Sequence, residues 1–387
     1  MVRNGIDRIG EYDKVLKGKR LGLITSISGV DGQLNSSIEI LHGKYGLEAL
    51  FAPEHGVRGN AGAGKVVETY KDPYTGVMVY SLYRKDSKRL TEEMLSHVDA
   101  VIYDIQDLGV RYYTFISTMI YAMEECAAYG KELIILDRYD PLGTKVEGNC
   151  LRPGYESFVG AYPLCMRYGM TVGELAQMVN KERNIGCELT VIPCEGWERR
   201  MLFPQTGNLW VMPSLGMPRF DTALLYPGAC LFEGTNISEG RGTAAPFEII
   251  GAPFLDGVEL TKRMKERKLP GVLFSPVYFK PSFSKHEGEE CEGTHIHITD
   301  YETYRACETG LVLLAEIQRM SEGRFAFLPP HTEGGRPFID LLFGSGKLSK
   351  AGLEQGLTEE ILQELQEEMK KDSEEFSERR NEFLLYR

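Results

Sequence analysis

Apolar and polar positions alternate in a repeating order from Arg20 to about Pro141. A short apolar run ends in a polar or Gly-containing loop, and a stretch with apolar residues three and four positions apart follows it. Several runs are continuous, as parallel strands buried on both faces are. The predicted strands are Leu21–Thr25, Leu47–Ala52, Val77–Tyr80, Ala100–Asp104 and Leu133–Asp137. This alternation predicts an α/β fold with a Rossmann-like, doubly wound parallel sheet.

The order loosens after Asp140-Pro141 into longer loops rich in Gly and Pro. Thr171 and Glu174 form a capping box that opens a helix. The further predicted elements are strands over Leu189–Ile192 and Val272–Phe279, a helix over Tyr304–Met320 and a docked surface helix over Thr358–Tyr386. We expect a Rossmann-like domain over residues 1–150, a smaller α/β domain over residues 151–387, and an active-site cleft between them.

Composition and charge narrow the choice of partners. The chain has 387 residues, and its 44 Lys and Arg against 56 Asp and Glu give a net charge of −12. Nucleic-acid binders normally carry a basic face, so no nucleic-acid partner is expected. Eight cysteines without a CxxC pair predict reduced, buried thiols rather than a disulfide scaffold.

The hydropathy pattern also bears on location. No stretch has the ~20 apolar residues of a spanning helix, so no membrane span is expected. The amino terminus is polar and charged and lacks the apolar core of a secretory signal. As given, the chain is predicted to be cytoplasmic. A chain whose signal had been removed would look the same, which leaves an extracytoplasmic location open.

Candidate chemistry follows the second predicted strand. Ligands bind beyond the carboxyl ends of the strands in open parallel sheets, and Glu54, His55 and Arg58 stand there. A carboxylate at the end of a buried strand can be desolvated, which suits a general acid. The alternative is a surface loop whose charges have no function.

The fourth predicted strand ends in a similar cluster. Asp104 and Gln106 share a strand face, so both can reach one ligand, and Asp107, Arg111 and Tyr112 follow. Carboxylates, amides and tyrosine rings suit a substrate rich in hydroxyl groups, such as a sugar. The alternative is an aspartate that caps a helix and forms a structural ion pair with Arg111.

A third cluster lies between Phe232 and Thr243, where Asn236, Glu239 and Arg241 stand among three glycines. Glycine lets the backbone approach a ligand closely. The segment is therefore expected to face the loops of the first domain, and a turn without function is the alternative.

Three segments argue against a cofactor. Gly59–Lys65 matches the start of a phosphate-binding GxxxxGK loop, but Val66 stands where Ser or Thr would hold Mg²⁺. His295 and His297 share a strand face with no third ligand indicated, so we expect them to be structural and infer no metal. No GxGxxG follows the first strand, which removes the main support for a dinucleotide.

Signature segments along most of the chain carry a family resemblance. They are Phe51–Gly59, Asp104–Asp107, Arg111–Thr114, Ser157–Gly160, Met170–Leu175 and Ser238–Thr243. In this order they resemble the exo-acting β-N-acetylmuramidases of the NamZ type, long known only as a domain of unknown function. The resemblance implies a glycoside hydrolase that takes N-acetylmuramic acid from the non-reducing end of peptidoglycan fragments, muropeptides or disaccharides, in cell-wall turnover and recycling.

The resemblance makes Glu54 the leading acid/base residue. A glycosidase also needs a second carboxylate, for which Glu239 and then Asp107 are the candidates. The lactyl carboxylate of N-acetylmuramic acid favours a guanidinium, because a planar fork binds it with two hydrogen bonds. Arg58 and Arg241 are the candidates, and Glu54, Asp107, Arg58 and Glu239 are expected to line one cleft. The expected substrate-binding residues are His55, Arg58, Asp104, Gln106, Arg111, Tyr112, Asn236 and Arg241.

Two other functions fit the same residues. A non-catalytic, two-lobed glycan-binding protein would use the polar side chains without needing an acid. A sugar-phosphate or nucleotide-sugar enzyme on a Rossmann-like domain would bind phosphate near Gly59–Lys65. Turnover that depends on Glu54 separates the hydrolase from the binding protein.

Overall fold

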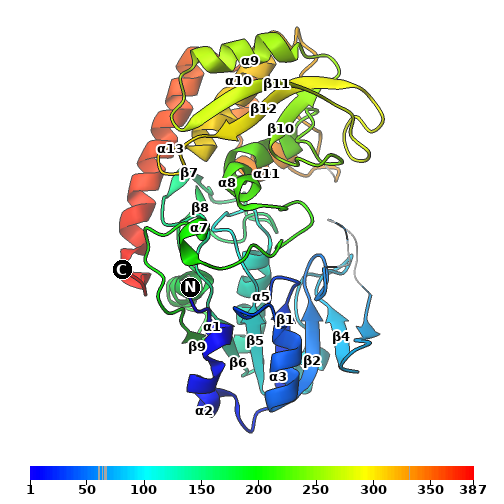
Figure 1. Ribbon diagram of the computed structural model, residues 1–387, viewed down its shortest axis with the longest axis vertical. Helices are drawn as coiled ribbons and strands as arrows, with labels where there is room; N and C mark the ends of the chain where they lie inside the picture. The colour runs from blue at the N-terminus through cyan, green and yellow to red at the C-terminus, as the bar shows by residue number, and fades with distance from the viewer. Residues whose placement is uncertain (60–61, 63, 65–67, 331) are drawn as a thin grey trace.

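The computed structural model describes residues 1–387 except 60, 61, 63, 65–67 and 331. Its first part is built on a seven-stranded sheet, in the lower half of Figure 1. The strands are β1 (Leu21–Thr25), β2 (Leu47–Ala52), β3 (Tyr70–Lys71), β4 (Met78–Ser81), β5 (Ala100–Asp104), β6 (Glu132–Leu136) and β9 (Glu188–Ile192). Their order is β3-β4-β2-β1-β5-β6-β9, and every neighbouring pair is parallel except β3 with β4.

The predicted parallel sheet is confirmed. The strands β1, β5 and β6 are buried along their whole length, which explains their continuous apolar sequences. Helices connect the parallel strands: α3 (Ser37–Tyr45), α4 (Glu92–Ser96), α5 (Phe115–Ala128) and α6 (Val172–Glu182). The capping box of Thr171 and Glu174 opens α6 as expected.

One strand lies in a different place from that predicted. Leu189–Ile192, expected in the second part, forms most of β9 and pairs in parallel with β6 at the edge of the large sheet. A short apolar run does not specify its partner. The crossover through α6 brings it back to the first sheet.

The second part centres on a three-stranded antiparallel sheet, in the order β10 (Ile249–Ala252), β12 (Cys291–Ile298) and β11 (Val272–Phe279). Its helices are α8 (Phe220–Ala229), α9 (Gly257–Glu266), α10 (Ala306–Met320), α11 (Phe338–Phe343) and α12 (Lys347–Glu354). Gly228 and Gly310 let α8 and α10 touch, since a Cβ at Gly228 would lie 2.0 Å from the carbonyl oxygen of Ala306.

The remaining elements connect the two parts. A hairpin of β7 (Glu147–Cys150) and β8 (Cys165–Arg167) lies against α13 (Glu359–Arg379). In Figure 1, α13 runs down one side of the upper half and ends beside the lower one. Asp372 of α13 accepts the backbone N–H of Cys150 at 2.8 Å, so the predicted docked surface helix is confirmed. Within the described residues, no helix is both long and apolar enough to span a bilayer.

Candidate active site

A cleft of about 980 Å³ lies between the two parts of the chain. The loops after β2, β4 and β5 supply one wall, whose lining includes Glu54, His55, Tyr83, Lys88, Tyr112, Tyr113 and Thr114. The second part supplies the other wall, whose lining includes Leu215, Gly216, Tyr226, Glu233, Arg241, Phe247 and Phe283. The cleft expected between the two α/β parts is present. Each of the two walls carries a carboxylate, Glu54 on the first and Glu233 on the second.

Glu54 stands two residues after the end of β2 and is half-buried. Thr114 Oγ1 donates a hydrogen bond of 2.8 Å to Glu54 Oε2, and the backbone N–H of Gly64 donates one of 2.9 Å to Oε1. Burial and the nearby Glu54 carboxylate raise the pKa of Tyr83 to about 12, so the phenol stays protonated. These donors fix the orientation of the Glu54 carboxyl group.

The opposite wall carries a half-buried ion pair. Nη2 of Arg241 donates to Oε1 of Glu233 at 2.7 Å, and the Arg241 guanidinium lies 4.9 Å above the ring of Phe247. Burial raises the pKa of Glu233, while the charge of Arg241 acts in the opposite direction. The cleft therefore presents one acid on each wall, with a guanidinium beside the second.

Glu239 lies behind this pair, and its side chain is only 2% exposed. Its Oε2 is 2.7 Å from Nζ of Lys285, and its Oε1 is 3.4 Å from Nε of Arg241. Lys285 also donates to the carbonyl oxygens of Phe232 and Thr235. Glu239 thus holds other residues of this wall in place and does not line the cleft.

Arg58 does not line the cleft either. Its guanidinium forms a two-pronged pair with Asp72, at 2.7 and 3.0 Å, and a further bond to Glu39. This pairing lowers the pKa of Asp72 to about 2. Of the two arginines considered for a carboxylate ligand, the structure brings Arg241 to the cleft.

Asp107 is buried at the carboxyl end of the sheet. Its Oδ2 accepts hydrogen bonds from the backbone N–H of Gly109 at 2.7 Å and from the hydroxyl of Tyr168. Burial raises its pKa to about 6. The expectation that Asp107 and Arg58 share a cleft with Glu54 is therefore wrong, because both are turned into internal contacts.

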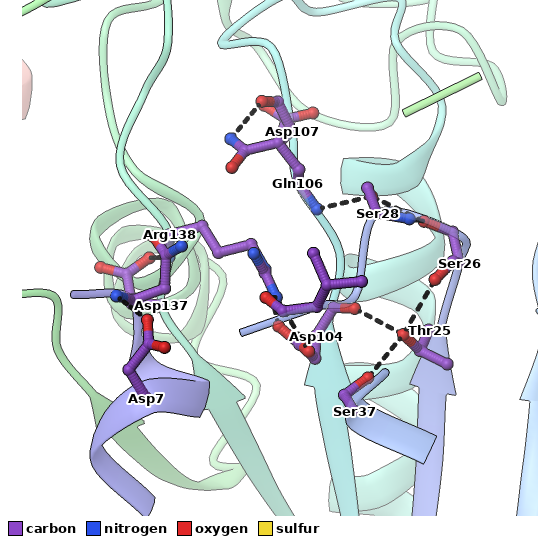
Figure 2. A network of polar contacts seen from close by, with 12 residues as sticks. Asp7, Thr25, Ser26, Ser28, Ser37, Asp104, Gln106, Asp107, Asp137 and Arg138 are labelled. Atoms are coloured by element: carbon purple, nitrogen blue, oxygen red, sulfur yellow. Dashed lines mark hydrogen bonds and ion pairs between the residues drawn. The ribbon is translucent and has the colours of Figure 1, made fainter. Parts of the chain in front are cut away.

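Asp104 and Gln106 belong to a separate polar network, shown in Figure 2. Asp104 pairs with Arg138 through bonds of 2.7 and 3.0 Å, so the ion pair considered with Arg111 is not formed. The amide of Gln106 donates to the carbonyl oxygens of Asp107 and Tyr139. These contacts occupy the edge between β1 and β5, where the strand order reverses and Rossmann folds bind nucleotides. The GxxxxGK-like stretch lies mostly outside the described residues, since 60, 61, 63 and 65 are among those left out.

Two further predicted binding residues have structural partners. Arg111 is completely buried and donates to four carbonyl oxygens, those of Asn149, Leu164, Leu342 and Phe343. It ties the first part to α11, and no N–H of its two terminal nitrogens is directed to the cleft. The side chain of Asn236 bonds to the backbone of Arg324 and Ala326. Neither residue lines the cleft, and the terminal nitrogens of Arg111 and the amide of Asn236 bond to backbone groups.

His55 and Tyr112 do line the cleft. His55 has a φ of 71°, in the left-handed region that non-glycine residues rarely adopt. Tyr112 packs edge-on against Tyr226, at 5.6 Å between ring centres. His295 and His297 lie side by side on β12, with ring centres 4.1 Å apart. The described residues hold no group of three or more His, Cys, Asp or Glu side chains arranged for a metal ion.

The sequence did not single out Glu233, Tyr83, Lys88 or Thr114 as functional residues of the cleft. Glu233 and Thr114 stand inside segments that the sequence had singled out, but the pattern gave no reason to prefer them. Lys88 places its ammonium 3.2 Å from the ring centre of Tyr83. The segment of these two residues has no strand or helix pattern that would mark it.

An α/β protein in two parts, with acids on facing walls of the cleft between them, has the layout of a glycoside hydrolase. Residues 21–221 match the family model of the N-terminal part of the exo-beta-N-acetylmuramidase NamZ, and residues 224–386 match that of its C-terminal part. The chain belongs to the NamZ exo-beta-N-acetylmuramidase family.

Relatives support this membership along the full length. The chain is 44% identical over 389 residues to the peptidoglycan beta-N-acetylmuramidase NamZ of Bacillus subtilis strain 168, covering 100% of this chain and 91% of that protein. Crystal structures of two DUF1343 family proteins from Bacteroides fragilis also match it. One is 35% identical with a TM-score of 0.90, and the other is 30% identical with a TM-score of 0.78. Each covers 100% of this chain and 99% of the solved one.

Proposed function

We propose that this protein is an exo-β-N-acetylmuramidase that releases N-acetylmuramic acid from the non-reducing end of peptidoglycan fragments. Family membership and the named B. subtilis relative support the reaction. The observation that carries the assignment to this site is the cleft itself. It presents Glu54 on one wall and Glu233, paired with Arg241, on the other.

Glu54 is proposed as the acid/base residue. A glycosidase protonates the oxygen that leaves the terminal sugar, and the same group can later accept a proton from water. The hydroxyl of Thr114, 2.8 Å away, can donate to the ionised carboxylate or accept from the protonated acid. Glu54 can therefore keep one orientation through both protonation states.

Glu233 is proposed as the second carboxylate, in place of Glu239 and Asp107. The transition state of glycoside hydrolysis carries positive charge on the sugar ring, which a carboxylate stabilises as base, nucleophile or counter-charge. Glu233 lines the cleft, whereas Glu239 and Asp107 are 2% and 4% exposed and bond to internal groups. Accessibility to the substrate supports Glu233.

Arg241 is proposed to bind the lactyl carboxylate of N-acetylmuramic acid. Its Nη2 bonds to Glu233, while its Nη1 approaches Gly216, where an added Cβ would lie only 3.3 Å away. Arg241 and Gly216 both line the cleft, so a carboxylate bound there can reach the guanidinium. A fixed fork of donors distinguishes a sugar with a carboxylate from N-acetylglucosamine, which has none.

The test is hydrolysis by the purified protein. It should release free N-acetylmuramic acid from a muramyl-glucosaminide disaccharide and should cleave a chromogenic β-N-acetylmuraminide faster than the matching β-N-acetylglucosaminide. Binding of the disaccharide without turnover would instead indicate a glycan-binding protein. Equal or faster cleavage of the glucosaminide would contradict the substrate assignment.

A further inference from the structure

Phe283 is an aromatic residue that lines the cleft and is nevertheless 57% exposed. The other aromatic residues of the lining are buried or half-buried, namely Tyr83, Tyr112, Tyr113, Phe158, Tyr226, Phe247 and Phe338. An exposed aromatic ring in the lining of a cleft offers an apolar surface that a ligand can cover.

The segment around Phe283 is tightly fixed. The backbone N–H and the hydroxyl of Ser282 both donate to the carbonyl oxygen of Gly242, at 2.9 and 2.8 Å. On the other side of Phe283, Lys285 forms its ion pair with Glu239, and Nε2 of His286 is 2.7 Å from the carbonyl oxygen of Asn236. The backbone on both sides of Phe283 is thus held by one neighbouring segment.

That neighbouring segment is the one that carries Arg241. Gly242 has a φ of +82°, and a Cβ there would lie 2.5 Å from the carbonyl oxygen of Phe283. Glycine is therefore needed for the two backbones to meet. Ser284 and His286 have φ values of 74° and 57°, which non-glycine residues rarely adopt. A strained conformation held by several contacts is typical of functional segments.

We propose that Phe283 forms a stacking platform for the second sugar ring of the substrate, the one on the leaving-group side of the bond that is cleaved. This inference rests on the proposed function. An exo-acting enzyme holds the terminal sugar in the inner part of its cleft, here at Glu233 and Arg241, and the rest of the substrate extends toward solvent. Phe283 adjoins Arg241 through Gly242, and it is the lining residue whose aromatic ring is most open to solvent. An aromatic face covers the apolar face of a pyranose ring and buries both.

The test compares two substrates in wild type and Phe283→Ala. One is the muramyl-glucosaminide disaccharide, and the other is trifluoroethyl β-N-acetylmuraminide, whose small leaving group has no ring. We expect Phe283→Ala to lower kcat/KM for the disaccharide roughly tenfold, as the loss of a buried aromatic contact implies, and to leave the trifluoroethyl substrate nearly unchanged. Phe283→Trp, which keeps an aromatic face, should retain the wild-type kcat/KM for the disaccharide. The matched control is Tyr278→Ala, which removes a 66% exposed aromatic residue of β11 that does not line the cleft.

The outcomes separate this inference from the proposed function. If wild type cleaves both substrates and Phe283→Ala leaves both kcat/KM values unchanged, the platform is wrong and the muramidase assignment stands. An equal loss on both substrates also overturns the platform, because it places Phe283 at the terminal sugar or in the fold. If wild type cleaves neither substrate, both proposals fail.

Discussion

The hydroxyl of Thr114 donates to Oε2 of Glu54 across 2.8 Å, and this bond joins the start of α5 to the loop after β2. Thr114 is the N-cap residue of α5, yet its side chain forms no capping bond to the helix. An N-cap threonine usually bonds to the backbone N–H groups of the first turn. Here the hydroxyl is directed at the acid of the cleft instead.

Glu54→Gln keeps the size and most hydrogen bonds of the side chain but removes the proton that it transfers. General acid/base catalysis contributes roughly 10²–10⁴-fold. We expect turnover of the chromogenic muraminide to fall by that factor while calorimetric titration still detects binding of the disaccharide. Undiminished hydrolysis by the variant would move the acid/base role away from Glu54.

Thr114→Val removes the hydroxyl with little change of volume. We expect kcat to fall about tenfold, from the loss of one hydrogen bond to a charged group, with little change in the free energy of unfolding, since no cap bond is lost. Thr91→Ala is the matched control, because the Thr91 hydroxyl does cap α4 by accepting the N–H of Met94. It should cost about 1 kcal/mol of stability and leave kcat unchanged. The reverse pattern would show that Thr114 serves the helix.

Arg241→Lys keeps the positive charge beside Glu233 but loses the planar fork. We expect the preference for muraminide over glucosaminide to fall by roughly tenfold or more in kcat/KM.

Arg58→Ala should keep this preference and should lower the free energy of unfolding instead. The pKa of Asp72 is lowered to about 2 from 3.8, so the stabilisation from the Arg58 pair is complete above about pH 4 and disappears as the pH falls through 2. Loss of the preference in Arg58→Ala would reassign the carboxylate ligand.

Asp107→Asn tests whether the buried carboxyl is catalytic. Burial raises its folded-state pKa from 3.8 to about 6, so the folded protein binds this proton more tightly than the unfolded chain does. Its contribution to stability is therefore full below about pH 4 and is lost as the pH rises through 6. Relative to wild type, the variant should gain stability between pH 4 and 7, on the order of 3 kcal/mol in denaturant unfolding. Turnover should persist, and its collapse would return Asp107 to the reaction.

The sequence predicts the strands of the first sheet well because continuous apolar runs leave few alternatives to buried parallel strands. Glu54 also lies in the cleft as predicted, because it follows the end of β2, a buried strand of the sheet. Asp107 follows β5 in the same way but turns inward to Tyr168, which stands 61 positions later. Periodicity within a strand carries no information about the direction of the chain after it ends.

The sequence also could not show which of Glu233 and Glu239 lines the cleft, for a related reason. Both stand in one glycine-rich segment, and local pattern treats them alike. Lys285, 46 positions after Glu239, draws Glu239 into the interior and leaves Glu233 beside Arg241 in the cleft. Likewise, the buried guanidinium of Arg111 is satisfied by carbonyl oxygens of Leu342 and Phe343, more than 230 positions away. Such long-range partners are not visible in a single sequence.

The segment after α13 has a consequence for how the chain reaches its native state. The hydroxyl of Tyr386 donates to Asp137 at the end of β6, 249 positions earlier, and the N–H of Leu385 donates to Glu174 of α6. During synthesis the strands of the first sheet are complete long before Leu385 and Tyr386 are made. Until then, Asp137 and Glu174 lack these hydrogen-bond partners. Closing so long a loop is entropically costly and slow. Two family models divide the chain near residue 222. The two parts are nevertheless expected to complete their folding together, because the end of the chain supplies contacts to the first part.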